Sequence, residues 1–299
     1  MILDRAGLVG YGEVGRIFAS GLLPRLAQVF AWDLRFALPG HRDAALAHAK
    51  QAGVNACTSM QAVCAESSLL ISAVTASSTL AVAQEAAPHL RPGTVFLDLN
   101  SASPGTKQAA AAAIEGAGGI YVEAGVMTSV PPYGIRVPML LGGPRAGELA
   151  PILRGWGMDA TVVSDRLGIA SAIKMCRSVM IKGLEALVIE SYATARAYGV
   201  EEHMIPTLAE TFPGIDWHKQ GAYFFSRVAQ HGQRRAEEMR EAANTVREAG
   251  FEPFMASAIA DKQQWVADQA RAGIFSGVQP GARWQDYADP LLAGRPPGP

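Results

Sequence analysis

Hydrophobic positions divide the chain into two parts with different periodicity. Up to about residue 165, short apolar runs alternate with segments of helical period, and beyond it helical periodicity dominates. Strands are predicted up to Val9 and Asp33 and over residues 54–56, 68–74, 94–100, 120–123, 139–141 and 160–164, with helices between them over 41–52, 59–65, 79–90, 106–117 and 146–156. Strands separated by helices of this length predict an α/β fold with a mostly parallel, doubly wound sheet.

The second part is expected to be an all-α domain of residues 166–289. Its helices are predicted over 169–198, 202–211, 222–230, 233–249 and 254–272, with glycines and prolines at the breaks. Residues 290–299 are rich in Pro and Gly and are expected to form a flexible tail.

The most specific motif is a glycine loop directly after the first apolar run. Gly10, Gly12 and Gly15 have the spacing G-x-G-x-x-G, and a helix-like segment follows them. The first glycine allows a tight turn, the second lets the backbone approach a pyrophosphate, and the third lets helix and strand pack closely. The spacing alone is weak among 31 glycines, but the order strand, glycines, helix predicts a Rossmann-type dinucleotide-binding domain over residues 1–165. Its expected cofactor-binding residues in this loop are Gly10, Tyr11, Gly12, Glu13, Val14 and Gly15.

An acidic residue, Asp33, ends the second predicted strand about 20 residues after the glycines. A carboxylate at this place accepts hydrogen bonds from the ribose hydroxyls of NAD and repels the extra phosphate of NADP. Arg35, two residues on, could turn toward that phosphate instead, so NAD is favoured and NADP stays open. Asp33 could also be a loop residue without a ligand.

Three loops follow strands of the predicted sheet, over residues 74–76, 100–104 and 125–129. Ligands of such sheets lie beyond the carboxyl ends of the strands. Val74, Thr75 and Ser101 therefore lie where a cofactor ribose or a substrate is expected. Ser103 precedes Pro104 and fits the cap of the next helix, which leaves Ser101 for another role.

The segment from Gly168 to Leu187 is expected to begin a long helix with two distinct faces. At about 100° per residue, one face carries polar and charged side chains and the other is apolar. The polar face holds Lys174, Ser178, Ile181, Lys182 and Glu185, with Arg177 at its margin, and the apolar stripe holds Ile173, Cys176, Met180, Leu184 and Leu187. Taken alone, the polar face could be solvated or functional. Lys182 and Glu185 could pair with each other, and Cys176 is expected to be a small core residue.

Taken together, these motifs resemble the β-hydroxyacid dehydrogenase family, which includes 3-hydroxyisobutyrate dehydrogenases, tartronate semialdehyde reductases and 6-phosphogluconate dehydrogenases. The resemblance rests on GLVGYGEVG, LDLNSASP, EAGVMTS and GIASAIKMCRS. It covers about the first 190 residues well and the remainder loosely. The pattern looks most like a phosphogluconate dehydrogenase-like subgroup with its own helical C-terminal domain.

The resemblance implies a role for several residues. Lys174 takes the place of the catalytic lysine, and Ser101 lies at the substrate. Thr128 and Ser129 stand in the loop that holds the substrate's polar groups. The segment ADKQQWVAD resembles a late Lys-Asp-Leu segment near the nicotinamide, which makes Lys262 a candidate cofactor-binding residue; otherwise it is a surface lysine. A homodimer is also implied.

The chain departs from the family pattern at two places. The expected Ser-Gly-Gly is Met127-Thr128-Ser129, and the expected Asn four residues after the lysine is Ser178. With Arg177 in place of a histidine, sugar-phosphate decarboxylation is put in doubt. Ser178 remains a candidate substrate residue. Arg234 and Arg235 lie in a charged helical segment that is either a solvated face or a carboxylate-binding site.

The overall composition excludes several classes of protein. Net charge is −1, without a basic excess, so no nucleic-acid partner is expected. No apolar run reaches about 18 residues, so no membrane span is expected. The three cysteines and six histidines show no metal-ligand spacing, and the N-terminus shows no secretion signal. A cytoplasmic protein without a metal site is therefore expected.

These observations predict an oxidoreductase that transfers hydride between a nicotinamide cofactor, NAD or NADP, and a small 3-hydroxy acid or related alcohol. Lys174 would act as general acid or base. One alternative is imine reduction on the same scaffold, although relatives with that activity generally lack the lysine. The other is a dinucleotide-binding sensor or scaffold without catalysis.

Overall fold

The computed structural model describes residues 3–293 and divides the chain into two compact units, Met1–Cys176 and Arg177–Pro299. Their boundary falls inside one long helix, α7 (Ile169–Tyr198). We call them unit 1 and unit 2 and describe each by itself.

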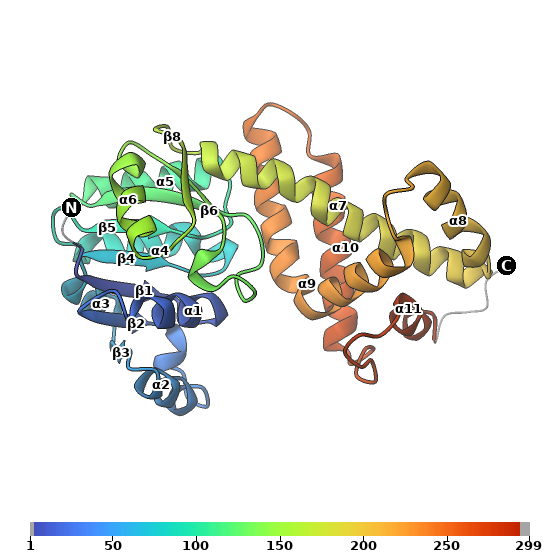
Figure 1. The fold of residues 1–299 in the computed structure, drawn as a ribbon, viewed down its shortest axis with the longest axis horizontal. Coiled ribbons are helices and arrows are strands. Elements are labelled where there is room, and N and C mark those ends of the chain that lie inside the picture. Colours follow the sequence, from blue (N-terminus) through green and yellow to red (C-terminus); the bar gives the residue numbers. More distant parts are fainter. Residues whose placement is uncertain (1–2, 294–299) are drawn as a thin grey trace. The chain divides into compact units, whose positions relative to one another are not determined.

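Unit 1, from residue 3 onward, is built on an eight-stranded sheet in the order β3-β2-β1-β4-β5-β6-β7-β8 (Figure 1). Strands β1 to β6 are parallel, β7 pairs antiparallel with β6, and β8 pairs parallel with β7, so the last two strands run opposite to the first six. The loop between β6 and β7 holds no crossover helix of the kind that parallel strands need. The strands are β1 (Arg5–Val9), β2 (Gln28–Trp32), β3 (Asn55–Ala56), β4 (Leu69–Ser72), β5 (Val95–Asp98), β6 (Ile120–Val126), β7 (Met139–Gly142) and β8 (Ala160–Ser164).

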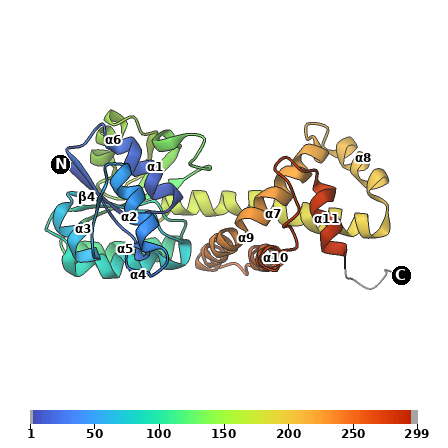
Figure 2. The ribbon, with the colours of Figure 1, turned by 90° about the horizontal axis from the view of Figure 1, so that it is seen from below.

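Helices cover both faces of this sheet, as Figure 2 shows. Helices α3, α4 and α5 pack side by side on one face, and α1 and α6 lie on the other. The helices are α1 (Glu13–Leu22), α2 (Arg42–Gln51), α3 (Met60–Glu66), α4 (Thr79–Ala86), α5 (Pro104–Gly116) and α6 (Ala146–Gly155), with short 3-10 turns η1 (Leu34–Phe36), η2 (Ala76–Ser78), η3 (Ala87–His89) and η4 (Gly134–Arg136). The predicted α/β fold is confirmed, and strands of almost entirely buried residues form its core.

Unit 2 is helical in its described residues, as predicted. After α7 come α8 (Glu201–Thr211), α9 (Trp217–Glu248), α10 (Phe254–Arg271) and α11 (Trp284–Leu292). The predicted helices over 222–230 and 233–249 are one helix, α9, with a kink at His231, whose φ is −132°. Helix α11 was not predicted; it places residues 290–292 of the expected tail in a helix, and residues 294–299 lie outside the described residues.

The core of unit 2 is an aromatic cluster. Trp284 on α11 contacts Tyr192 on α7 at a ring-centroid distance of 5.0 Å and Phe225 on α9 at 6.4 Å. Gly221 makes this packing possible, because a Cβ there would lie 2.7 Å from the Tyr192 ring. Within residues 3–293, no helix is both long enough and apolar enough to cross a bilayer.

Candidate active site

The glycine loop joins β1 to α1 and leaves its backbone open on one side. Gly10 has φ +93°, and a Cβ there would lie 2.5 Å from the Ala73 carbonyl oxygen. A Cβ on Gly15 would lie 2.0 Å from the Gly10 oxygen, so strand and helix meet too closely for any side chain. At Gly12, by contrast, a Cβ would meet only the Arg35 guanidinium, at 3.6 Å.

Helix α1 begins without a side-chain cap on Gly12. No side chain of the cap residue accepts from its first backbone N–H groups, which can therefore donate hydrogen bonds to a ligand. The helix dipole favours a negatively charged ligand at this end. An open Gly12 beside an uncapped helix N-terminus fits the pyrophosphate of a dinucleotide.

Asp33 follows β2 and is engaged by the protein itself. Its carboxylate accepts hydrogen bonds from the Tyr11 N–H at 2.7 Å, the Arg35 N–H at 2.9 Å and both Nε and Nη2 of Arg35 at 2.9 Å. Burial alone would raise the pKa of Asp33, but these hydrogen bonds and the charge of Arg35 hold it below its usual value. All four of its acceptor positions are used, so a ribose hydroxyl reaches this carboxylate only if Arg35 moves.

The Lys174 ammonium meets the Ser101 hydroxyl at the carboxyl edge of the sheet. Nζ donates a hydrogen bond to Oγ at 2.6 Å, although the two residues lie 73 positions apart. Lys174 is on α7, and Ser101 is on the loop between β5 and α5. Both residues are half-buried.

Glycine and glutamate residues of β6 fix the start of α7. A Cβ on Gly125 would lie 3.0 Å from the Ala170 carbonyl oxygen and 3.5 Å from Lys174 Cβ, so a larger residue would displace the helix. The buried Glu123 carboxylate accepts hydrogen bonds from the N–H groups of Gly168 at 2.8 Å and Ala170 at 3.1 Å. It therefore caps the helix that carries Lys174.

The Glu123 carboxyl lies in a poorly solvated position. Burial raises its pKa, and the charge of Lys107 and the hydrogen bonds from Ala170 and Gly168 only partly oppose this. Its second oxygen has no hydrogen-bond partner among the described residues.

A buried polar network at the end of β5 supports the β5–α5 loop, which carries Ser101. Asp98, at the end of β5, pairs with the Lys107 ammonium at 3.0 Å and accepts a hydrogen bond from the Tyr121 hydroxyl at 2.6 Å. Burial, together with the Asp98 charge, raises the pKa of Tyr121 well above its ordinary value, so this hydroxyl stays a donor. Lys107 also donates to the Asp98 carbonyl oxygen at 3.0 Å.

Asn100 links this network to the neighbouring loop. Its side chain donates to Ser72 Oγ at 2.9 Å and accepts from the Val74 N–H at 2.7 Å, and its own N–H donates to Asp98 at 2.8 Å. The Val74 N–H is thus engaged by the protein. Ser103 caps α5 by accepting from the Thr106 N–H at 3.2 Å, as predicted.

The remaining candidate residues for cofactor and substrate binding lie on two loops of unit 1 and in unit 2. The exposed Thr75 hydroxyl is within hydrogen-bond distance of the Ser77 and Ser78 hydroxyls, and Thr128 and Ser129 lie on the β6–β7 loop, exposed and half-buried. In unit 2, Ser178 is buried and accepts from Lys182 at 3.2 Å, and Lys262 pairs with Glu190 at 2.7 Å.

Within unit 2, the charged residues of the polar face of α7 are buried, and part of its apolar stripe is exposed. Lys182 pairs with Glu238 of α9 at 2.8 Å, and Glu185 pairs with Arg235 of α9. The possible pairing of Lys182 with Glu185 does not form, because α9 offers each a partner of opposite charge. Cys176 is exposed rather than buried. Met180 and Leu187 on the same stripe are 66% and 56% exposed.

Sequence reasoning missed Glu123, Asp98, Lys107 and Tyr121. Two of them carried a signal: Asp98 and Glu123 are acidic residues inside strongly apolar runs, where a charge needs buried partners. Lys107 had no such signal, because an Ala-rich helix with one lysine is typical of a solvated helix.

Comparison with known proteins identifies the family. The NAD binding domain of 6-phosphogluconate dehydrogenase matches residues 5–161, which is more than half of the chain. The chain belongs to this family. A domain of unknown function, DUF1932, matches residues 195–266. The first unit is thus an NAD(P)-binding domain, as the resemblance to β-hydroxyacid dehydrogenases implied.

Solved structures extend the likeness over both units. A conserved hypothetical protein from Sinorhizobium meliloti 1021 is 38% identical, covers 97% of this chain and 96% of its own, and has a TM-score of 0.74. The conserved protein MTH1747, of unknown function and structurally similar to 3-hydroxyacid dehydrogenases, is 30% identical over 90% of this chain and 98% of its own, with a TM-score of 0.67. Mycobacterium tuberculosis 3-hydroxyisobutyrate dehydrogenase, 17% identical over 90% of this chain and 96% of its own, shares the fold with a TM-score of 0.69.

Proposed function

We propose that the protein is a cytoplasmic NAD(P)-dependent oxidoreductase that transfers hydride between the nicotinamide and a small 3-hydroxy acid or related alcohol. The observation that carries this proposal is the 2.6 Å hydrogen bond between Lys174 Nζ and Ser101 Oγ. It lies at the carboxyl edge of the strands in the unit that also carries the open glycine loop.

In this proposal, Lys174 handles the proton and Ser101 positions the substrate oxygen. In oxidation, the neutral amine form of Lys174 accepts the proton of the substrate O–H at Nζ and becomes an ammonium, while the C–H electron pair leaves as hydride. In reduction, the ammonium form returns the proton to the new alkoxide and becomes the neutral amine. Bound nicotinamide supplies the hydride acceptor or donor. Thr128 and Ser129 would hold further polar groups of the substrate. The proposal does not need Lys262, which the structure pairs with Glu190.

The cofactor preference depends on Asp33 and Arg35. A ribose hydroxyl and the Arg35 guanidinium compete for the same carboxylate oxygens. Displacement of Arg35 by the ribose favours NAD, as expected from the sequence, whereas rotation of Arg35 toward a 2′-phosphate favours NADP.

A titration followed by a turnover assay tests the proposal. NADH or NADPH fluorescence should show saturable binding, and a panel of 3-hydroxy acids and alcohols should then reveal turnover. Turnover only of imines would favour the alternative of an imine reductase. Dinucleotide binding without turnover of any compound would favour a sensor or scaffold.

The homodimer implied by the resemblance is part of the same proposal. On α7, Met180 and Leu187 lie seven residues apart, on one side of the helix, and both are largely exposed. We infer that this pair forms part of the dimer contact. Light scattering should give the mass of a dimer, and the change of both residues to Glu should give that of a monomer.

A further inference from the structure

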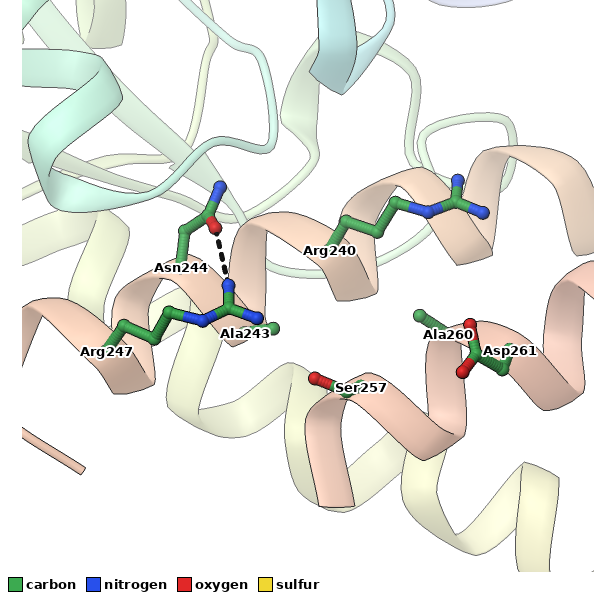
Figure 3. Close-up of a pocket in the computed structure, with 7 residues that line it drawn as sticks. All are labelled: Arg240, Ala243, Asn244, Arg247, Ser257, Ala260 and Asp261. Atoms are coloured by element: carbon green, nitrogen blue, oxygen red, sulfur yellow. Dashed lines mark hydrogen bonds between the residues drawn. The ribbon is translucent and has the colours of Figure 1, made fainter. Parts of the chain in front are cut away.

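A hollow in unit 2 lies between α9 and α10, which pack side by side (Figures 1 and 2). Its volume is about 180 Å³. Figure 3 shows that one wall comes from α9 and the other from α10. The lining residues are Arg240, Ala243, Asn244, Arg247, Ser257, Ala260 and Asp261.

Helix geometry explains why these side chains meet. Arg240, Asn244 and Arg247 are spaced i, i+4, i+7 along α9, and Ser257 and Asp261 are spaced i, i+4 along α10. Each set therefore lies along one side of its helix. The buried Ala243 and Ala260 are small, which leaves room between the polar groups.

The two arginines of the hollow differ from Arg234 and Arg235, which precede them on α9. Arg235 pairs with Glu185, and Arg234 with Glu238. Among the described residues, neither Arg240 nor Arg247 has a carboxylate within ion-pair distance.

Arg240 and Arg247 instead bind neutral groups of the protein. Arg240 donates to Gln264 at 3.0 Å, and Arg247 to Asn244 at 2.9 Å. A guanidinium has five N–H donors, so most of theirs face no protein acceptor in the described part of the chain.

The charge and size of the hollow limit its ligand. Two guanidinium groups and one carboxylate, that of Asp261, line the hollow, and the Glu241 carboxylate next to it accepts a hydrogen bond from Asn244 at 3.1 Å. The guanidinium fork matches a carboxylate or phosphate. A volume of 180 Å³ corresponds to roughly six water molecules at about 30 Å³ each, which is too small for a dinucleotide. Asp261 has no hydrogen bond or ion pair within residues 3–293, so it can accept from a hydroxyl or ammonium group.

We propose that this hollow is a binding site for a small oxyanion, a carboxylate or a phosphate, that also carries a hydroxyl or ammonium group. Arg240 and Arg247 hold the oxyanion, and Ser257 and Asp261 hold the donor group. All the residues that line it belong to unit 2, and the proposal does not use Lys174.

Calorimetric titration of the full chain with simple probes tests this site. Propionate, 3-hydroxypropionate and β-alanine have the same carbon chain, and inorganic phosphate and phosphoethanolamine represent the other oxyanion. We expect saturable binding, tighter for 3-hydroxypropionate or β-alanine than for propionate. The two series identify the oxyanion. Failure of every probe to saturate would overturn the proposal.

Variants locate the binding. Arg240→Gln and Arg247→Gln should each weaken it by roughly tenfold, through loss of a charge-assisted hydrogen bond. Asp261→Asn should abolish the advantage of β-alanine over propionate, and Ser257→Leu should block the hollow without a change of charge. Arg271→Gln, on the same helix α10 but paired with Asp268 outside the hollow, is the control and should bind as wild type.

Lys174→Ala separates this proposal from the proposed function. Binding should persist in that variant, whether or not the wild type shows turnover. Probe binding that is lost in Lys174→Ala and kept in both arginine variants would place the ligand at Lys174 and overturn the site between α9 and α10. Circular dichroism of each variant verifies that it is folded.

Discussion

Two lysines of α7 occupy opposite kinds of surroundings. Lys174, in unit 1, donates to the hydroxyl of Ser101 at 2.6 Å and is half-buried. Lys182, two turns later in unit 2, is buried and pairs with the Glu238 carboxylate at 2.8 Å. Both lie on the polar face that the helical period predicts for α7. One has the surroundings of a reacting group, and the other those of a structural ion pair.

The difference shows what helical periodicity can and cannot predict. The period correctly separates a polar face from an apolar one, but it does not tell which face packs inward. In unit 2 the polar face is buried, because Arg235 and Glu238 of α9 neutralise Glu185 and Lys182. Met180 and Leu187 of the apolar stripe are exposed to solvent instead, which reverses the usual arrangement of a surface helix.

The largest expected effect is on turnover, and it should separate the two lysines. Lys174→Ala should lower kcat by about a hundredfold to ten-thousandfold, because the proton then has no positioned acceptor. It should leave the Kd for the dinucleotide and the thermal midpoint almost unchanged. Lys182→Met should do the reverse: it should lower the free energy of unfolding by about 1–3 kcal/mol, since Glu238 keeps a mostly desolvated carboxylate, and keep kcat.

Steady-state kinetics and thermal unfolding measure both effects. Lys50→Ala, which changes an exposed lysine of α2, is the control for loss of charge. Equal losses of turnover in the Lys174 and Lys182 variants would contradict the division of roles, and full turnover in Lys174→Ala would remove this lysine from the mechanism.

The second prediction compares the buried ion pairs of the two units. Lys107→Met leaves the Asp98 carboxylate buried without its cation, and Arg235→Met does the same to Glu185. Each should lower the free energy of unfolding by about 3–5 kcal/mol. Only Lys107→Met should also raise KM for the substrate, because Asp98 and Asn100 hold the loop that carries Ser101.

Denaturant unfolding and the KM of each folded variant provide the measurement. Lys107→Arg keeps the charge, so its KM should lie between those of Lys107→Met and the wild type. A KM that rises equally in Arg235→Met would mean that general loosening, rather than the position of Ser101, causes the effect.

Much of unit 1 could be predicted because its signals are local. Buried parallel strands are apolar runs bounded by turns, and the glycine loop has a fixed spacing. Helix α7 was predicted with its observed bounds, Ile169–Tyr198. The joining of 222–230 and 233–249 into α9 was missed, because packing against α10 carries the helix through His231 and Gly232.

The supporting groups of the site could not be predicted from local pattern. Glu123 acts on residues 45 and 47 positions away, and Tyr121 reaches Asp98 across the sheet. Such pairs depend on strand order and register, which one sequence does not specify residue by residue. The hollow between α9 and α10 was missed for the same reason, because its two walls come from different helices.

The third prediction concerns the cofactor and a smaller effect. Arg35→Ala should weaken the binding of NADPH relative to NADH by about tenfold, measured as the ratio of their Kd values, because it removes a guanidinium that can bind a phosphate. Asp33→Asn should shift the ratio toward NADPH, because it weakens the hold on Arg35 and removes a repelling charge. Fluorescence titration measures both. Arg25→Ala, an exposed arginine in the same unit, should leave the ratio unchanged, and unaltered ratios in the first two variants would exclude this pair as the determinant.

The smallest expected effect is the pH dependence that Glu123 contributes to stability. Because its folded pKa is raised, Glu123 takes up a proton more readily in the folded state than in the unfolded state. Its stabilising contribution is therefore complete below the unfolded pKa, about 4.3, and is lost as the pH rises through the folded value. Glu123→Gln keeps an acceptor for Gly168 and Ala170 but does not titrate, and any packing cost of the amide is the same at every pH.

The thermal midpoint of Glu123→Gln relative to wild type should thus increase as the pH rises from about 4 to 7, by an amount on the order of a few degrees. Unfolding followed by circular dichroism over that range measures the difference. Glu66→Gln, at an exposed ion pair with Arg5, is the control and should give a nearly flat line. A difference that decreases with rising pH would mean that the amides at the start of α7 lower the Glu123 pKa more than burial raises it, and that the charged carboxylate helps to hold the helix that carries Lys174.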